Sequence, residues 1–179
     1  MLFPKTPRFL VKVSGFLCHD PASYAFVAGL YERAPTAFVR FIPGGGIDVD
    51  AEFRRRGLPI RPRGPMGREM PTFEEREAQR SVIEDNASFA RCTFAFMQLY
   101  PRVTAPYVDI DDDDSDCPQD GDEMVRILYD NYDEIFILCT KDEGRAIKKV
   151  QTFAQFPKVT ILHKEGDDFV NSRSLITEL

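Results

Sequence analysis

The segment from Glu134 to Thr140 constrains the fold more than any other part of the chain. It reads Glu-Ile-Phe-Ile-Leu-Cys-Thr, with apolar residues in sequence and no polar alternation. A strand with one solvent-facing side alternates apolar and polar residues, whereas an uninterrupted apolar run is typical of a strand buried on both faces. Such strands lie inside parallel sheets that helices cover on both sides. The segment therefore predicts an α/β protein.

The N-terminal part of the chain has a strand, a helix and a second strand in succession. Phe9–Val13 is β-prone, and Asp20 followed by Pro21 supplies a helix N-cap and a proline at the first helical position. Pro35 ends that helix, and Thr36–Ile42 is an apolar run of strand length. This succession is the pattern of a βαβ unit with two parallel strands.

The middle of the chain begins with a turn at Gly44–Gly46, which the sequence predicts to precede a short strand over Ile47–Phe53. Residues 54–71 are rich in Arg, Pro and Gly and are expected to form a long loop, a kind of segment that is often functional. Thr72 with Glu75 then forms a capping box that opens a helix running to about residue 100.

The C-terminal part repeats the alternation of strands and helices. The sequence predicts strands over 103–110, 134–140 and 159–162, with helices that start near Asp120 and Thr140. The expected fold is a single three-layer Rossmann-like domain over residues 1–179, with a mostly parallel sheet of about five strands flanked by helices.

Charge and hydropathy limit the environment and partners of the chain. The net charge is −6, which argues against bulk electrostatic binding of nucleic acid. The sequence contains no apolar segment approaching the ~18 residues of a membrane span. Its four cysteines form no CxxC pair, and reduced thiols are expected. We therefore expect an intracellular protein, most simply cytoplasmic, with no membrane partner.

Acidic side chains are dense at the end of the predicted strand over 103–110. Ligands of open parallel sheets bind at the carboxyl ends of the strands, and carboxylates there suit Mg²⁺ or Mn²⁺. Asp109 and Asp111 share one side of an extended chain. We expect Asp109, Asp111 and Asp142 as catalytic residues and Asp109, Asp111, Asp167 and Asp168 as metal ligands. A solvated acidic loop is the alternative interpretation of this run.

Basic side chains gather in the 54–71 loop and at two further strand ends. Such groups suit the phosphates of a substrate or of a nucleic acid, or an acidic protein partner. The alternative is a solubilising loop. The expected contact residues are Arg54, Arg55, Arg56, Arg61, Arg63, Lys141 and Lys164.

The order of short motifs in the second half of the chain resembles that of two enzyme families. Asp109-x-Asp111, Thr140, a lysine at 149 or 164 and Gly166-Asp167-Asp168 follow an order similar to that of haloacid-dehalogenase-type phosphohydrolases. That resemblance implies Asp109 as nucleophile and Asp111 as general acid. The segment 132–138 resembles one in PIN- or NYN-type nucleases, which also carry acids at strand ends.

Two functions remain open from the sequence. One is a phosphoester hydrolase, phosphatase- or nuclease-like, that depends on a divalent metal bound by strand-end aspartates. The other is a non-catalytic interaction protein that docks through its arginine-rich loop and its acidic run. Mg²⁺ should raise the melting temperature only in the first case.

Overall fold

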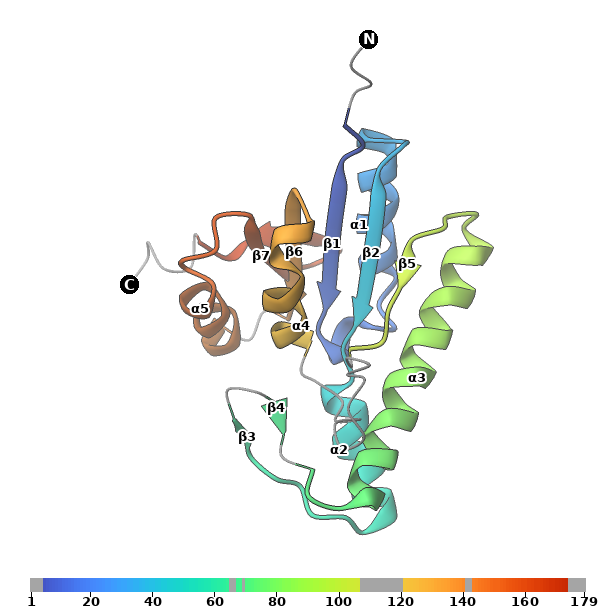
Figure 1. The fold of residues 1–179 in the computed structure, drawn as a ribbon, viewed down its shortest axis with the longest axis vertical. Coiled ribbons are helices and arrows are strands. Elements are labelled where there is room, and N and C mark those ends of the chain that lie inside the picture. The colour runs from blue at the N-terminus through green and yellow to red at the C-terminus, as the bar shows by residue number, and fades with distance from the viewer. Residues whose placement is uncertain (1–4, 65–66, 69, 107–120, 141–142, 174–179) are drawn as a thin grey trace.

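The computed structural model describes residues 5–64, 67–68, 70–106, 121–140 and 143–173. They form a six-stranded sheet in the order β5-β2-β1-β6-β7-β8, in which every pairing is parallel except that of β7 with β8 (Figure 1). The predicted mostly parallel α/β fold is confirmed, with six strands rather than about five.

The strands lie close to their predicted positions. The sheet is built from β1 (Arg8–Val13), β2 (Phe38–Pro43), β5 (Arg102–Val103), β6 (Glu134–Cys139), β7 (Val159–Glu165) and β8 (Asp168–Asn171). A separate antiparallel hairpin, β3 (Arg63–Gly64) with β4 (Gly67–Arg68), lies within the arginine-rich segment. The strand predicted over 103–110 is described only to residue 106, and only its start is β5.

Local capping signals position two of the helices. α1 (Pro21–Arg33) starts where Asp20 accepts a hydrogen bond from the Ala22 amide at 3.0 Å. α3 (Phe73–Phe96) starts at the predicted capping box, in which Thr72 accepts from the Glu75 amide at 3.2 Å and Glu75 accepts from the Thr72 amide at 3.0 Å. Both N-cap predictions are confirmed.

The remaining helices include one that the sequence analysis missed. α2 (Gly46–Arg56) replaces the short strand predicted over Ile47–Phe53, so that prediction is wrong. Val49 and Phe53 are about one helical turn apart, and α2 buries both against Ala78 and Val82 of α3. α4 (Gly121–Leu128) and α5 (Glu143–Thr152) agree with prediction, and two 3₁₀ turns, η1 (Gly15–Leu17) and η2 (Tyr129–Asn131), follow β1 and α4.

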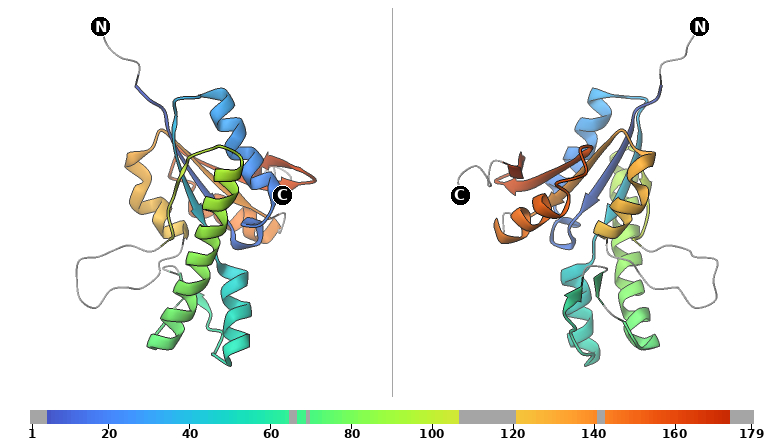
Figure 2. Two further views of the ribbon diagram at one scale, coloured as in Figure 1. Left: turned by 90° about the vertical axis from the view of Figure 1, so that its right-hand side faces the viewer. Right: turned by 60° about the vertical axis from the view of Figure 1, so that its left-hand side comes forward.

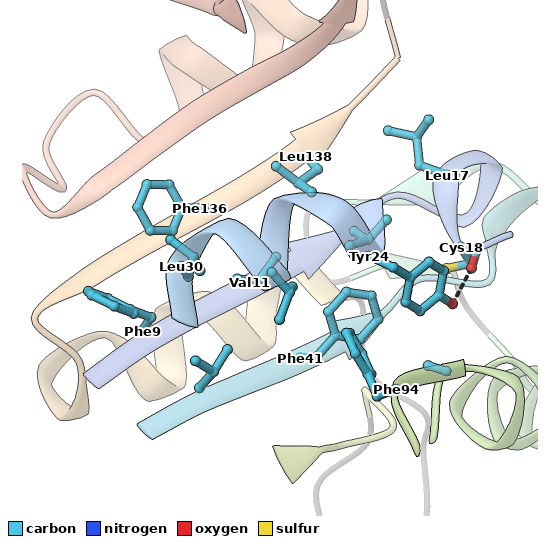
Figure 3. Close-up of a cluster of buried hydrophobic side chains, with 14 of the residues drawn as sticks. Phe9, Val11, Leu17, Cys18, Tyr24, Leu30, Phe41, Phe94, Phe136 and Leu138 are labelled. Carbon is cyan, nitrogen blue, oxygen red and sulfur yellow. Dashed lines mark hydrogen bonds between the residues drawn. The ribbon is translucent and has the colours of Figure 1, made fainter. Parts of the chain in front are cut away.

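Helices cover both faces of the sheet, as three layers require (Figure 1). Alternate residues of β1 enter two different cores: Phe9, Val11 and Val13 pack with α1 and α3, and Leu10 packs with α4 and the start of α5 on the other face. Figure 3 shows the first core, in which the Tyr24 hydroxyl donates to the Cys18 carbonyl at 2.5 Å. Figure 2 shows α2 beside the first half of α3, beyond the carboxyl ends of the strands, whereas the second half of α3 runs along the sheet.

The chain reverses direction across the sheet at β1. From β1 it moves to β2 and β5 on one side, and then returns to β6, β7 and β8 on the other. The carboxyl ends of β1 and β6 therefore flank a topological switch point, where open α/β sheets form their ligand crevices. None of the described helices is long and apolar enough to cross a membrane.

Candidate functional site: a basic pocket between two glycine loops

A pocket of about 630 Å³ opens at this switch point, a volume within the range of small-molecule sites. Its floor is formed by the ends of β1 and β6, with Lys12 and Cys139 among the lining residues. The first turns of α2 and part of α3 form one wall, and α4 with α5 forms the other. The site therefore joins the two halves of the sheet.

Two glycine-containing loops meet backbone to backbone at the centre of the pocket. A Cβ atom added to Gly15 would lie 2.7 Å from the Gly46 nitrogen, and one added to Gly44 would lie 2.6 Å from the Val13 carbonyl oxygen. The Gly44 amide donates to that same carbonyl at 2.8 Å. Neither position has space for a side chain, so the loops after β1 and β2 pack closely against each other where they line the pocket.

This surface includes the N-terminus of α2. Gly45 is the N-cap and offers no side chain to the free amides, while its carbonyl accepts from the Val49 amide at 2.8 Å. The first amides of a helix, together with its dipole, favour negative charge. An anion in the pocket can therefore take the place that a capping side chain would occupy.

A carboxylate between two lysines lies on the opposite wall. Lys12 Nζ is 2.7 Å from Asp122, which also accepts a hydrogen bond from Lys149. The side chain of Lys12 is only 6% exposed, and it passes over Gly121, where an added Cβ would lie 2.8 Å from Lys12 Cε. Lysines are rarely buried to this extent unless they are paired, which indicates that Asp122 holds Lys12 in place.

The charge of this trio remains positive. Burial raises the pKa of Asp122, but the attraction and hydrogen bonds of Lys12 and Lys149 outweigh it and hold the pKa far below its usual range. Asp122 is therefore ionised at neutral pH, and two lysines with one carboxylate leave a net charge of +1. Arg126, Arg145 and Lys148 also line the pocket. Among the described lining residues, five basic side chains outnumber two acidic ones, Asp50 and Asp122, although the protein as a whole is acidic.

Two buried polar atoms on the pocket lining have no hydrogen-bond partner. These are Ser14 Oγ, at the end of β1, and Gln79 Oε1, on α3. Buried polar groups are nearly always satisfied by protein, water or ligand. Both residues line the pocket, so a small movement of either side chain would let its oxygen bond to a ligand there.

A buried asparagine fixes the loop after β2. Asn86 Nδ2 on α3 donates to the Gly44 carbonyl and to the Asp48 carboxylate of α2, each at 2.9 Å. Asn86 Oδ1 is 3.2 Å from His19 Nε2. Because the Nδ2 group of Asn86 donates to Gly44 and Asp48, its Oδ1 atom is an acceptor, and His19 Nε2 is the donor of this hydrogen bond. Asn86 therefore ties the glycine loop and the start of α2 to α3.

A cysteine adds a second donor to the same carbonyl. Cys18 Sγ is 3.0 Å from the Gly44 oxygen, and burial raises the pKa of the thiol to about 12. The thiol is thus protonated and donates. It has a positioning role rather than the role of a nucleophile.

None of the predicted site residues whose side chains the structure describes lines this pocket. Asp109, Asp111, Lys141 and Asp142 lie outside the described residues. Asp167 and Asp168 are exposed at the turn between β7 and β8, and the neighbouring Lys164 forms an ion pair with Asp20. Within the described residues, no group of three or more His, Cys, Asp or Glu side chains is arranged to hold a metal ion.

The arginines of the predicted contact loop lie away from the pocket. Arg54, Arg55 and Arg56 form the last turn of α2, where Arg55 and Arg56 pair with Glu52 at 2.7 and 2.6 Å. Arg61 pairs with the buried Glu75 at 3.0 Å. Arg63 is in β3, and its side chain lies outside the described part of the chain. Three of these arginines thus have carboxylate partners within the chain.

Sequence reasoning missed Lys12, Asp122, Lys149 and Asn86 as site residues. One signal was present: Lys12 interrupts an apolar strand, and a charged residue there must find a partner. Asn86 likewise interrupts the apolar face of α3, between Ile83 and Ala90. No protein-family model matches the chain, and comparison with curated proteins gives no match. The pocket must therefore be interpreted from its own chemistry.

Proposed function

We propose that the protein is an enzyme that binds a phosphate-bearing substrate in the basic pocket and transfers its phosphoryl group, to water or to another acceptor. The observation that carries the proposal is the juxtaposition of the Lys12–Asp122–Lys149 trio with the uncapped N-terminus of α2. Positive charge and backbone amides on two walls of one crevice are what a phosphate group requires.

The same groups can support catalysis as well as binding. Phosphoryl transfer depends mainly on positioning and on electrostatic stabilisation of charge that spreads over the phosphoryl oxygens. Lys12 is held by Asp122 in a nearly buried position, and the α2 amides are fixed through Asn86 and Gly44. Groups that are already in place need little rearrangement when the transition state forms.

The divalent cation expected from the sequence remains part of this proposal, with Asp109 and Asp111 as its ligands. Asp122 is a poor candidate for that role, because Lys12 and Lys149 already occupy its oxygens. The described pocket supplies phosphate-binding groups only. Docking through the arginine-rich loop stays the alternative.

Calorimetric titration with inorganic pyrophosphate tests the proposal. Lys149→Met removes one cation of the trio and should weaken binding about tenfold or more, because a charge-assisted hydrogen bond is lost. Lys158→Met is the matched control, since Lys158 lies over the Tyr129 ring, 4.8 Å from its centroid, and does not line the pocket. Equal affinities of the two variants, or no binding by the wild type, would refute the proposal.

A further inference from the structure

Three arginines lie together on one face of the sheet, away from the pocket. Strand register sets this arrangement. Arg40 on β2 is beside Arg102 on β5. Arg8 on β1 is beside Phe38, which is two residues before Arg40 on β2 and therefore on the same face. Partners in a parallel ladder and residues two apart in a strand point to the same face. We name Arg8, Arg40 and Arg102 the arginine triad. In Figure 1, α1 lies behind β1 and β2, and α4 lies beside them.

Aromatic rings hold two of these guanidinium groups. Arg8 Cζ is 5.1 Å from the centroid of the Phe38 ring and 5.5 Å from that of Tyr132, and Arg40 Cζ is 5.8 Å from the Tyr132 centroid. Phe38 and Tyr132 are themselves stacked, with centroids 6.4 Å apart. Rings in these positions favour the cations.

Described carboxylates do not neutralise the triad. No ion pair joins a described carboxylate to the side chain of Arg8, Arg40 or Arg102. The nearby Asp133 accepts from the Arg8 backbone amide and pairs with Lys5 instead. Three uncompensated cations repel one another, so their proximity needs another source of stabilisation.

Arg40 shows the effect of this crowding most clearly. Its Nε atom is buried and has no hydrogen-bond partner. Burial lowers the pKa of Arg40, and the charges of Arg102 and Arg8 lower it further. A bound anion would offset the repulsion among the three guanidinium groups.

We infer that the arginine triad is a second anion-binding site, specific for a small oligophosphate and separate from the basic pocket. Several negative charges on one compact ligand match three guanidinium groups, whose planar forks suit phosphate oxygens. An extended nucleic acid fits less well, because the Asp133 carboxylate lies beside the Arg8 backbone and the net charge of the protein is −6. The inference does not depend on the function proposed for the pocket.

Calorimetry with inorganic triphosphate tests this site in the Lys149→Met background, which weakens the pocket. One triphosphate-binding event should remain in this background. Adding Arg8→Gln and Arg102→Gln should raise its dissociation constant about a hundredfold, because each substitution removes a charge-assisted hydrogen bond and costs about tenfold in affinity. Both residues are exposed, so the fold should persist, which urea unfolding checks. Arg33→Gln is the matched control, because Arg33 also lies over a ring, that of Phe9, on the opposite sheet face.

Three outcomes would overturn the inference. The first is that the Arg8→Gln/Arg102→Gln variant binds triphosphate as tightly as its Lys149→Met parent, or that this parent binds none. The second is that citrate, a tricarboxylate, binds the triad as tightly as triphosphate, which would remove the specificity for phosphate. The third is that a single-stranded oligonucleotide binds it more tightly than triphosphate, which would make the triad a nucleic-acid surface.

Discussion

Replacing Asp122 with asparagine should lower stability and strengthen phosphate binding in the same protein. The substitution keeps the shape of the side chain but removes the negative charge between Lys12 and Lys149. Breaking a fully buried ion pair by removing one partner costs about 3–5 kcal/mol. The Asp122 side chain is 26% exposed, so water offsets part of that cost. We therefore expect a loss of about 2–3 kcal/mol in the free energy of unfolding.

The effect on ligand affinity has the opposite sign. Without Asp122 the charge of the trio rises from +1 to +2, so inorganic pyrophosphate should bind several-fold more tightly. Urea unfolding gives the stability and calorimetry gives the affinity, with Asp130→Asn as a control on an exposed aspartate of η2. A stability loss no larger than that of the control, or weaker pyrophosphate binding, would refute the account of the trio.

The pH dependence of this effect follows from the lowered pKa of Asp122. A carboxyl whose pKa is lower in the folded state stabilises the protein above its unfolded pKa, about 4 for aspartate. This contribution is lost as the pH falls toward the folded pKa, because both states then bind the proton. The stability difference between wild type and Asp122→Asn should thus stay constant from pH 6 to 8 and shrink below about pH 4.

Three further predictions concern the loops, α3 and the metal. Gly44→Ala should destabilise the protein by more than about 1 kcal/mol, because the added methyl group forces the backbone to shift. Gly29→Ala is the control and should stabilise the protein by about 0.5–1 kcal/mol, because no atom lies within 4 Å of the added Cβ. Equal effects of the two substitutions in thermal unfolding would contradict the close packing of the loops. Asn86→Ala should cost about 2–4 kcal/mol, because it removes the hydrogen bonds to the Gly44 carbonyl, to the Asp48 carboxylate and from His19, and it should weaken pyrophosphate binding. A stability loss with unchanged affinity would remove its link to the pocket. Millimolar Mg²⁺ should raise the melting temperature, and Asp109→Asn should abolish that rise; a flat melting temperature in the wild type would exclude the metal.

The sequence predicted those elements whose signals are local. The unbroken apolar run of β6, the Asp20 cap and the Thr72–Glu75 capping box each depend on a few adjacent residues, and each has the expected structure. α2 was missed because its apolar residues at 47, 49 and 53 also fit an alternating strand. The deciding fact, burial of Val49 and Phe53 against α3, is a tertiary contact.

The site was harder to predict for the same physical reason. Lys12, Asp122 and Lys149 come from three separate elements, and only the strand order brings β1, α4 and α5 to one crevice. The switch-point rule located the edge of the sheet where the pocket lies. The dense acids favoured Asp109 and Asp111, which lie outside the described residues, and did not point to the basic residues. A lysine inside an apolar strand was the more informative signal.

The most direct test of the central claim is a titration of the ¹⁵N-labelled protein with inorganic pyrophosphate, followed by amide chemical shifts. The account predicts saturable shifts at Gly45, Gly46 and Ile47, which lie at the start of α2, and their loss in Lys149→Met. Shifts of the arginine triad region alone, with these three amides unmoved, would contradict the claim that the pocket binds phosphate.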